Sequence, residues 1–282
     1  MLNKKHICGV ISLFFLGLIT LAIAKEEPEM QGNRLTVQYT NPDKPGTIEA
    51  SLVNGGITVV GYDGKEVIVE AKTKSKKITT EHQNEKAKGL FRIPVSSTGL
   101  TVEEENNVIE ISVESWKRTI DLDIRVPNKT SLKLSCVNAG DISVENVEGE
   151  IDVNNINGKV TLANVGGTVI AHALNKALVV TLEKVYPEKS MSFSTLNGDI
   201  DVTLPSKTKA NLKMKSDNGE IYSDFEIRLE KNPRNVIEKN TRKKDGKYRI
   251  EIEHAMFGSL NGGGLEMQFT SFNGDIYIRK GK

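Results

Sequence analysis

The sequence predicts an all-β fold, a β-solenoid or β-helix-like stack of short strands joined by Asn-Gly turns. Three observations predict it. A nine-residue phrase repeats with constant phase from residue 140 onward, Asn-Gly followed two residues later by Ile recurs elsewhere, and glycine is plentiful (24) while proline is scarce (8). Turns are therefore frequent, and glycine makes most of them.

The nine-residue repeat is defined by four glycines and by the apolar residues that follow each of them. The glycines are Gly140, Gly149, Gly158 and Gly167. Positions +2 and +4 have the two-residue period of a strand, and position +7 is apolar again after a short turn, whereas a helix would need apolar residues at +3 and +4 together. We therefore expect all three positions to face a core. The expected core residues are Ile142, Val144, Val147, Ile151, Val153, Ile156, Val160, Leu162, Val165, Val169, Ala171 and Leu174.

One nine-residue unit is too short for a full coil, so we expect two units per coil and a flattened solenoid with two sheets. The competing geometry is an antiparallel meander, because Asn-Gly is also a strong hairpin signal. Constant phase favours the solenoid, since a meander has no reason to keep position +7 apolar. Position +6 carries Asn146, Asn155 and Asn164, which predicts a stacked Asn column at a corner, and Cys136 takes this position in a preceding unit.

The Asn-Gly phrase recurs along the rest of the chain with irregular spacing. It appears as NGGITVVG (54–61), NGDIDVTLP (197–205), NGEIYS (218–223) and NGDIYIRK (273–280). A longer pair of segments, VPNKTSLKLS (126–135) and LPSKTKANLKMKS (204–216), leads each time into another Asn/Gly turn. This pair indicates the duplication of a larger module.

The first residues differ in composition from the rest. Lys4 and Lys5 precede an apolar run that ends in Ala-Ile-Ala at residue 24, which predicts a signal peptide over residues 1–24. The alternative is an uncleaved membrane anchor, because the apolar run is close to spanning length. We expect an exported protein, which is periplasmic, cell-surface or extracellular and has no membrane span once the signal is removed.

The rest of the chain is interpreted as a leader and one domain. Residues 25–45 form a polar leader, and residues 46–282 form a single elongated β-solenoid domain. Polar excursions near 72–98 and 229–246 interrupt that domain, because both stretches are rich in charge and poor in core residues.

Composition narrows the function. The formal net charge of +1 argues against a nucleic-acid partner, which normally requires a strong basic excess, and only 5% of residues are aromatic. Without residues 1–24 the chain keeps one cysteine, Cys136, so an intramolecular disulfide is excluded and stability must come from strand ladders and core burial.

Two stretches resemble a known family. GSLNGGGLEMQFTSFNGDIYIRK (258–280) and SLVNGGITVVGYDGKEVIVEAKT (51–73) resemble the end and the opening of the bacterial "putative adhesin" family of unknown function, whose style head-domain auto-transporter adhesins share. The resemblance implies an exported β-solenoid on the bacterial envelope. It rests on turn-and-strand motifs and carries over no catalytic residues.

The sequence contains none of the residue patterns that we searched for as signs of catalysis or metal binding. The histidines have no zinc-ligand spacing and no nucleophile elbow is present. Calcium-binding β-rolls place Asp two residues after Gly, where this repeat has Ile or Val. We therefore predict no catalytic, cofactor-binding or metal residues, and no cofactor.

These observations predict a non-enzymatic, adhesin-like or scaffold module that binds an unidentified envelope or extracellular ligand, either protein or polysaccharide. One alternative is a β-helix enzyme acting on polysaccharide, with Glu150 and Asp152, or Glu220 and Asp224, as candidate carboxylates. Another is a periplasmic envelope-signalling partner.

Overall fold

The computed structural model of the chain describes residues 34–73, 99–114, 118–138, 140–230 and 255–281. These residues form strands and turns and no helix, which confirms the predicted all-β class. Accordingly, this part of the chain offers no helix of the length and hydropathy that crossing a membrane would require. The predicted signal peptide lies outside the described residues, as do most of the two predicted polar excursions.

Buried and exposed residues alternate along most of the strands, as the two-residue period of a strand requires. The first strands are β1 (Arg34–Gln38), β2 (Gly46–Asn54), β3 (Ile57–Tyr62), β4 (Glu66–Thr73), β5 (Leu100–Glu105), β6 (Val108–Val113) and β7 (Ile120–Pro127). The central strands are β8 (Thr130–Asn138), β9 (Ile142–Glu145), β10 (Glu148–Asn155), β11 (Val160–Ala173), β12 (Leu178–Val185), β13 (Met191–Asn197) and β14 (Ile200–Leu204). The last strands are β15 (Ala210–Ser216), β16 (Ile221–Ser223), β17 (Arg228–Leu229), β18 (Met256–Leu260), β19 (Leu265–Asn273) and β20 (Ile276–Lys280).

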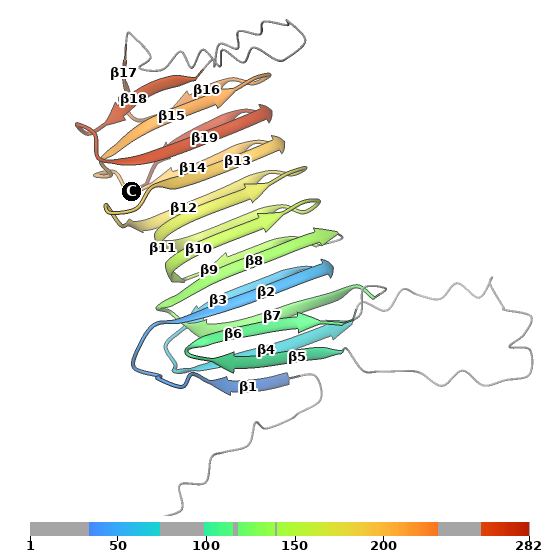
Figure 1. The fold of residues 1–282 in the computed structure, drawn as a ribbon. Coiled ribbons are helices and arrows are strands. Elements are labelled where there is room, and N and C mark those ends of the chain that lie inside the picture. The colour runs from blue at the N-terminus through green and yellow to red at the C-terminus, as the bar shows by residue number, and fades with distance from the viewer. Residues whose placement is uncertain (1–33, 74–98, 115–117, 139, 231–254, 282) are drawn as a thin grey trace, which may run out of the picture.

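Two ladders of parallel strands follow the long direction of the molecule (Figure 1). The first ladder stacks β6, β2, β8, β10, the second half of β11, β13, β19 and β15 in that order. The second ladder stacks β7, β3, β9, the first half of β11, β12, β14, β20 and β16. The chain passes from a strand of the first ladder to a strand of the second and back, and we call one such circuit a coil.

In the centre, two nine-residue units separate residues that lie side by side. Val160 pairs with Ile142, and Val169 pairs with Ile151, both in parallel register. Every residue at positions +2 and +4 of the four units is buried, which confirms these core predictions. A lone coil could not bury these side chains, because their covering atoms belong to the neighbouring coils.

Position +7 does not behave uniformly, and this part of the core prediction is wrong. Val147 and Val165 are buried, but Ile156 is only half-buried and Leu174 is exposed. The reason is that one unit is half a coil, so successive +7 residues fall at two different corners. One corner turns its +7 side chain into the core, and the other turns it toward solvent.

The predicted single Asn column is divided for the same reason. Asn146 and Asn164 share one corner, both with left-handed backbone (φ 57° and 52°), and the Asn164 side chain lies 3.5 Å from that of Asn146. Asn155 lies at the opposite corner, is buried, and donates to the carbonyl oxygen of Gly140 at 3.1 Å. Left-handed backbone at the first corner suits Asn, whose short side chain tolerates it.

Cys136 does occupy the position of Asn155, because the two residues pair directly in register. Its thiol is buried, and burial raises the pKa of Cys136 to about 12, with the nearby Asp121 carboxylate adding to the rise. A thiol that stays protonated is a poor nucleophile. Cys136 is therefore a core residue of the corner rather than a reactive group.

Two coils sit out of chain order. The coil of β2 and β3 lies between the coil of β6 and β7 and the coil of β8 and β9. The coil of β19 and β20 lies between that of β13 and β14 and that of β15 and β16. Accordingly, the C-terminus lies part-way along the stack (Figure 1). Phe269 of the inserted β19 stacks on Phe193 of β13, with ring centroids 5.1 Å apart.

Antiparallel strands cover both ends of the stack. At the N-terminal end β5 pairs with β6, and β1, part of the predicted polar leader, pairs with β4, which in turn pairs with β7. At the C-terminal end β18 pairs with β15, and β17 pairs with β18. Exposed strand edges invite further pairing, so a reversal of strand direction at each end stops the parallel stack.

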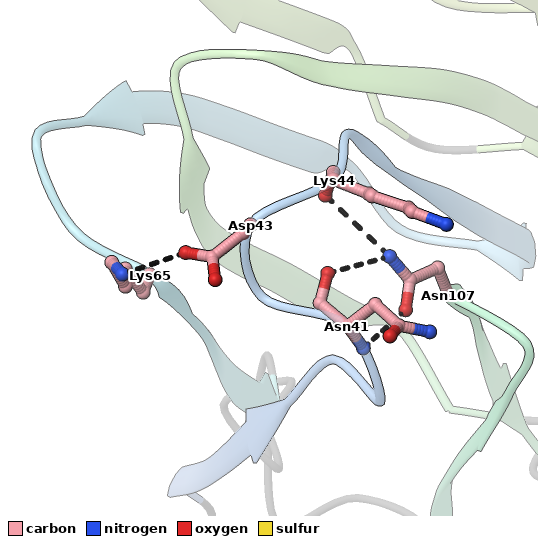
Figure 2. A network of polar contacts seen from close by, with 5 residues as sticks. All are labelled: Asn41, Asp43, Lys44, Lys65 and Asn107. Carbon is pink, nitrogen blue, oxygen red and sulfur yellow. Dashed lines mark hydrogen bonds and ion pairs between the residues drawn. The ribbon is translucent and has the colours of Figure 1, made fainter.

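The loop between β1 and β2 is tied to the β5–β6 turn by a small polar network (Figure 2). The Asn41 N–H donates to the Asn107 side chain at 2.7 Å, and the Asn107 amide donates back to the Asn41 carbonyl at 2.9 Å. Lys65 pairs with Asp43 of the same loop at 2.9 Å. Asn107 has left-handed backbone (φ 66°), which aims its side chain at this loop. The network holds the N-terminal loop against the stack.

Candidate binding surface

A continuous chain of asparagine side chains follows one corner of the stack. Its members in spatial order are Asn138, Asn157, Asn175, Asn197, Asn273 and Asn218, and we call it the Asn ladder. Each side-chain amide donates to the side-chain oxygen of the preceding member, at 2.8 to 3.0 Å. Asn54 continues the same position into β2, because it pairs in register with Asn138. The ladder therefore links coils that are far apart in the sequence.

Glycine directly follows four members of the Asn ladder, and at these positions the backbone packs too closely for any side chain. A Cβ atom on Gly158 would lie 1.8 Å from the Gly140 carbonyl oxygen, and one on Gly274 would lie 2.2 Å from that of Gly198. Real Cβ atoms do not approach backbone this closely, so glycine is required there by the stacking of neighbouring coils. This close approach brings the Asn side chains within hydrogen-bond distance of one another.

Aspartates that follow these glycines are also occupied. The Asp141 carboxylate accepts from the Lys159 N–H at 2.8 Å, and Asp199 accepts from the Asp275 N–H at 2.9 Å. Asp275 in turn accepts from the Glu220 N–H at 2.9 Å. These carboxylates bridge one coil to the next. Within the described residues, His, Cys, Asp and Glu side chains form no group that could hold a metal ion.

An exposed row of apolar side chains runs beside the Asn ladder. We call it the apolar stripe, and its residues in spatial order are Val53, Val137, Ile156, Leu174, Leu196 and Phe272. Val53 directly precedes Asn54, and each of the others directly precedes a member of the Asn ladder. Val53, Leu174, Leu196 and Phe272 are between 40 and 51% exposed, and the other two are half-buried. With about 4.8 Å between neighbouring strands, six positions span roughly 24 Å.

The outer face of the first ladder continues from the stripe as a row of short polar side chains. Its residues, paired in register, are Ser51, Ser135, Asn154, His172, Ser194 and Thr270. His172 faces outward, as parity predicts, and its Nδ1 hydrogen-bonds Ser194 Oγ. Apart from the His172 imidazole, the side chains of this row are short, which keeps the row flat. A flat strip of hydroxyls and amides with an apolar border can contact an extended or flat partner without a pocket.

The repeat pattern does not predict the stripe. It places Ile156 and Leu174 in the core, and it does not extend to Leu196 or Phe272. A signal was present: an apolar residue stands directly before the Asn in "LNGD" (196–199) and "FNGD" (272–275), where a polar residue would have been compatible with the turn. The signal was ambiguous, because burial of a side chain at a corner depends on which corner the turn forms.

The carboxylates considered for catalysis do not converge. Glu150 pairs with Lys189, and Asp152 is exposed on the flat outer face of β10. The Asp224 carboxylate accepts from the Lys280 N–H at 2.6 Å, and Glu220 is exposed at the start of β16. Neither pair lies in a cavity among the described residues. Their geometry is that of surface charges.

One acidic side chain, Glu148, is held in place by two side-chain hydrogen bonds. The Glu148 carboxylate accepts from Lys184 and from the Tyr186 hydroxyl, both at 2.6 Å, at the corner opposite the Asn ladder. These two hydrogen bonds lower the pKa of Glu148 from its ordinary value, the Lys184 bond most. The carboxylate is thus held charged, which suits a link between β10 and β12 and is the reverse of what a general acid requires.

Comparison with known proteins adds little. No protein-family model matches the chain, and no curated protein matches it. Two solved structures show a likeness at 13% sequence identity. A putative cell adhesion protein from Clostridium sporogenes ATCC 15579 covers 90% of this chain and is covered over 100% of its own, with a TM-score of 0.48. A putative adhesin from Bacteroides fragilis NCTC 9343 covers 89% and is covered over 98%, with a TM-score of 0.29. At these TM-scores we draw no conclusion from either.

Proposed function

We propose that the chain is an exported, non-enzymatic, adhesin-like binding module built as a β-solenoid. Its ligand is an envelope or extracellular macromolecule that lies along the flat face of the first ladder. The observation that carries the proposal is the apolar stripe, which keeps six apolar side chains at one solvent-facing corner across coils from both ends of the molecule.

The solenoid assignment is supported by the parallel register of both ladders. Residues such as Ile142, Val160 and Leu178 stack directly on one another in consecutive coils. An antiparallel meander would reverse the strand direction at each step. The two inserted coils keep the same register as their neighbours, so the stack is continuous through them.

A surface of this kind favours binding. Covering a half-exposed leucine contributes on the order of 1 kcal/mol, so covering the stripe contributes several kcal/mol before the entropy of association is subtracted. The Asn ladder holds the backbone at the corner, so little ordering is needed when a partner binds. We therefore expect moderate affinity from one module and stronger attachment where several modules act together.

The polysaccharide-enzyme alternative requires two carboxylates across one bond, about 5 to 10 Å apart in a groove. The candidates Glu150 and Asp152 lie on a flat face, and one of them is held by a lysine. An envelope-signalling partner would use the same face as an adhesin, so it remains the second candidate for the same surface.

The test is binding of the purified full chain to intact bacterial cells and to isolated envelope material. The variant Leu174→Ser/Leu196→Ser/Phe272→Ser should lose at least tenfold in binding. The matched control Met256→Ser removes a side chain of similar exposure, 45%, from β18 at the C-terminal end of the stack, outside the stripe and the flat face, and should bind within twofold of the wild type. Retained binding by a folded triple variant would contradict the proposal. Protease treatment of intact producing cells would separate surface display from periplasmic residence.

A further inference from the structure

A second surface feature lies on the outer face of the second ladder, near its C-terminal end. Tyr277 of β20 stacks on Tyr222 of β16, with ring centroids 5.2 Å apart and ring planes 11° from parallel. On its other side lies the Arg279 guanidinium, whose carbon is 5.2 Å from the Tyr277 centroid. Arg279 is held there by Asp201 of β14, with Nε 2.7 Å from the carboxylate.

The strand order explains this arrangement. Tyr277 pairs in register with Asp201 on one side and with Tyr222 on the other. Arg279 therefore leans toward β14 and Tyr222 lies toward the end of the stack. The result is a three-layer stack of guanidinium, phenol and phenol, in which one ring face of Tyr222 has no aromatic or cationic neighbour among the described residues.

The inner ring is fixed and the outer ring is available. The Tyr277 hydroxyl donates to Asp275 at 3.0 Å, and this bond raises the pKa of Tyr277. Tyr222 is 50% exposed, and its hydroxyl has no hydrogen-bond partner in the described part of the chain. A ring with one face stacked on a fixed neighbour and the other face exposed needs little ordering when a ligand stacks on it.

We propose that the open face of Tyr222 is a stacking site for an uncharged hexopyranose ring of a polysaccharide. The face of an aromatic ring carries partial negative charge, and the C–H groups on one face of a pyranose carry partial positive charge. The Asp224 carboxylate, one oxygen of which accepts from the Lys280 N–H, and the Tyr222 hydroxyl, which has no partner among the described residues, supply hydrogen-bond partners for sugar hydroxyls.

The charged side chains near Tyr222 favour an uncharged sugar over an acidic one. Glu220 directly precedes β16 and Asp224 directly follows it, so two exposed carboxylates lie two residues from Tyr222 along the chain. Their carboxylates disfavour a uronic or sialic acid beside the ring. A quaternary ammonium ligand is disfavoured because such ligands are bound by cages of several rings, and Tyr222 offers one open face. A neutral sugar meets both conditions.

This site lies on the second ladder and does not depend on the apolar stripe. The test measures binding of the full chain to neutral oligosaccharides of glucose, galactose, mannose and N-acetylglucosamine, with polygalacturonate as the acidic comparison. We expect at least one neutral series to bind. Tyr222→Ala should weaken that binding at least tenfold, Tyr222→Phe should keep it within about threefold, and Leu174→Ser should leave it unchanged.

Three outcomes would overturn the inference. They are no binding to any neutral series, equal binding by a folded Tyr222→Ala variant, and preferential binding of polygalacturonate. Tyr222 is half exposed, so circular dichroism of Tyr222→Ala should match that of the wild type. Loss of cell binding in the stripe variant with sugar binding intact would separate the two sites.

Discussion

The middle of the stack and its two ends are built by different rules. In the middle, from β8 to β14, coils follow one another in chain order, and contacting asparagines are 18 to 22 residues apart. At the ends a coil is inserted out of order. Asn197 then contacts Asn273 across 76 residues, and Glu49 contacts Lys133 across 84.

The inserted coils close a stack whose single coils are unstable on their own. A coil in chain order can open from an end with the loss of only its nearest neighbour. An inserted coil pairs on both sides with strands that are distant in sequence, so it can separate from the stack only when both neighbours are lost. The closure costs loop entropy and slow long-range pairing during folding, and it yields ends that resist fraying.

The largest effect should come from the core of an inserted coil. Phe269→Ala removes a fully buried ring stacked on Phe193 and should lower the free energy of unfolding by about 3–5 kcal/mol. The matched control Phe272→Ala lies on the same strand but is 46% exposed, and should change stability by less than about 0.5 kcal/mol. Urea unfolding measures both.

Hydrogen exchange sharpens the same comparison. In Phe269→Ala, amides of β15 should lose protection because β19 is their parallel partner, whereas amides of β8 should not change. Unchanged protection in β15 would show that the inserted coil does not hold the C-terminal end.

Substitution of the corner glycines should have the second-largest effect on stability, and the effect should be similar in the middle of the stack and in the inserted coil. Gly158→Ala in the middle and Gly274→Ala in the inserted coil both drive a Cβ into backbone, and each should cost about 1–3 kcal/mol. Gly166→Ala is the control, because its Cβ would meet the flexible Glu148 side chain at 3.2 Å. A loss in thermal stability for Gly166→Ala as large as for the other two would argue against backbone crowding as the cause.

The Asn ladder should show a smaller effect that is equal in both regions. Asn175→Ala and Asn273→Ala each remove two ladder hydrogen bonds and should cost about 0.5–1.5 kcal/mol per bond. Asn154→Ala, which removes an exposed side chain of β10 that forms no hydrogen bond with another described residue, should be near neutral in denaturant titrations. A much larger cost at Asn273 would mean that the ladder mainly secures the inserted coil.

The smallest effect should come from Glu148, which links two coils of the middle. Its pKa is lowered in the folded state, so its contribution is present above the unfolded carboxyl pKa of about 4.3 and is lost as the pH falls through the folded value. Because Lys184 is mostly exposed and solvent screens the pair, Glu148→Gln should cost less than about 1 kcal/mol at pH 7 and nothing near pH 2. Denaturation at both values checks this, and a cost that persists in acid would rule out the ionic origin.

Much of the fold could be predicted from local pattern. Alternation at +2 and +4 placed Ile142, Ile151 and Val160 in the core, and it did so because side-chain direction in a strand depends only on parity. The same reasoning failed at Leu174 and Asn155, because a corner turn can direct a side chain inward or outward and the repeat does not encode which.

The candidate surfaces were less accessible to such reasoning. The apolar stripe was visible only as single apolar residues before Asn, and the stack of Tyr222, Tyr277 and Arg279 was not visible at all. Tyr222 and Tyr277 are far apart in the chain, and they meet only because β20 is inserted beside β16. No local pattern specifies that neighbour.

The sequence by itself determined the strand class and the burial of the +2 and +4 residues of the repeat, because both depend on the parity of residues along a strand. The tertiary structure alone decided the order of the coils, the assignment of each corner and therefore which side chains form a common surface. These follow from pairing between distant strands, whose energy depends on which neighbour completes the buried core.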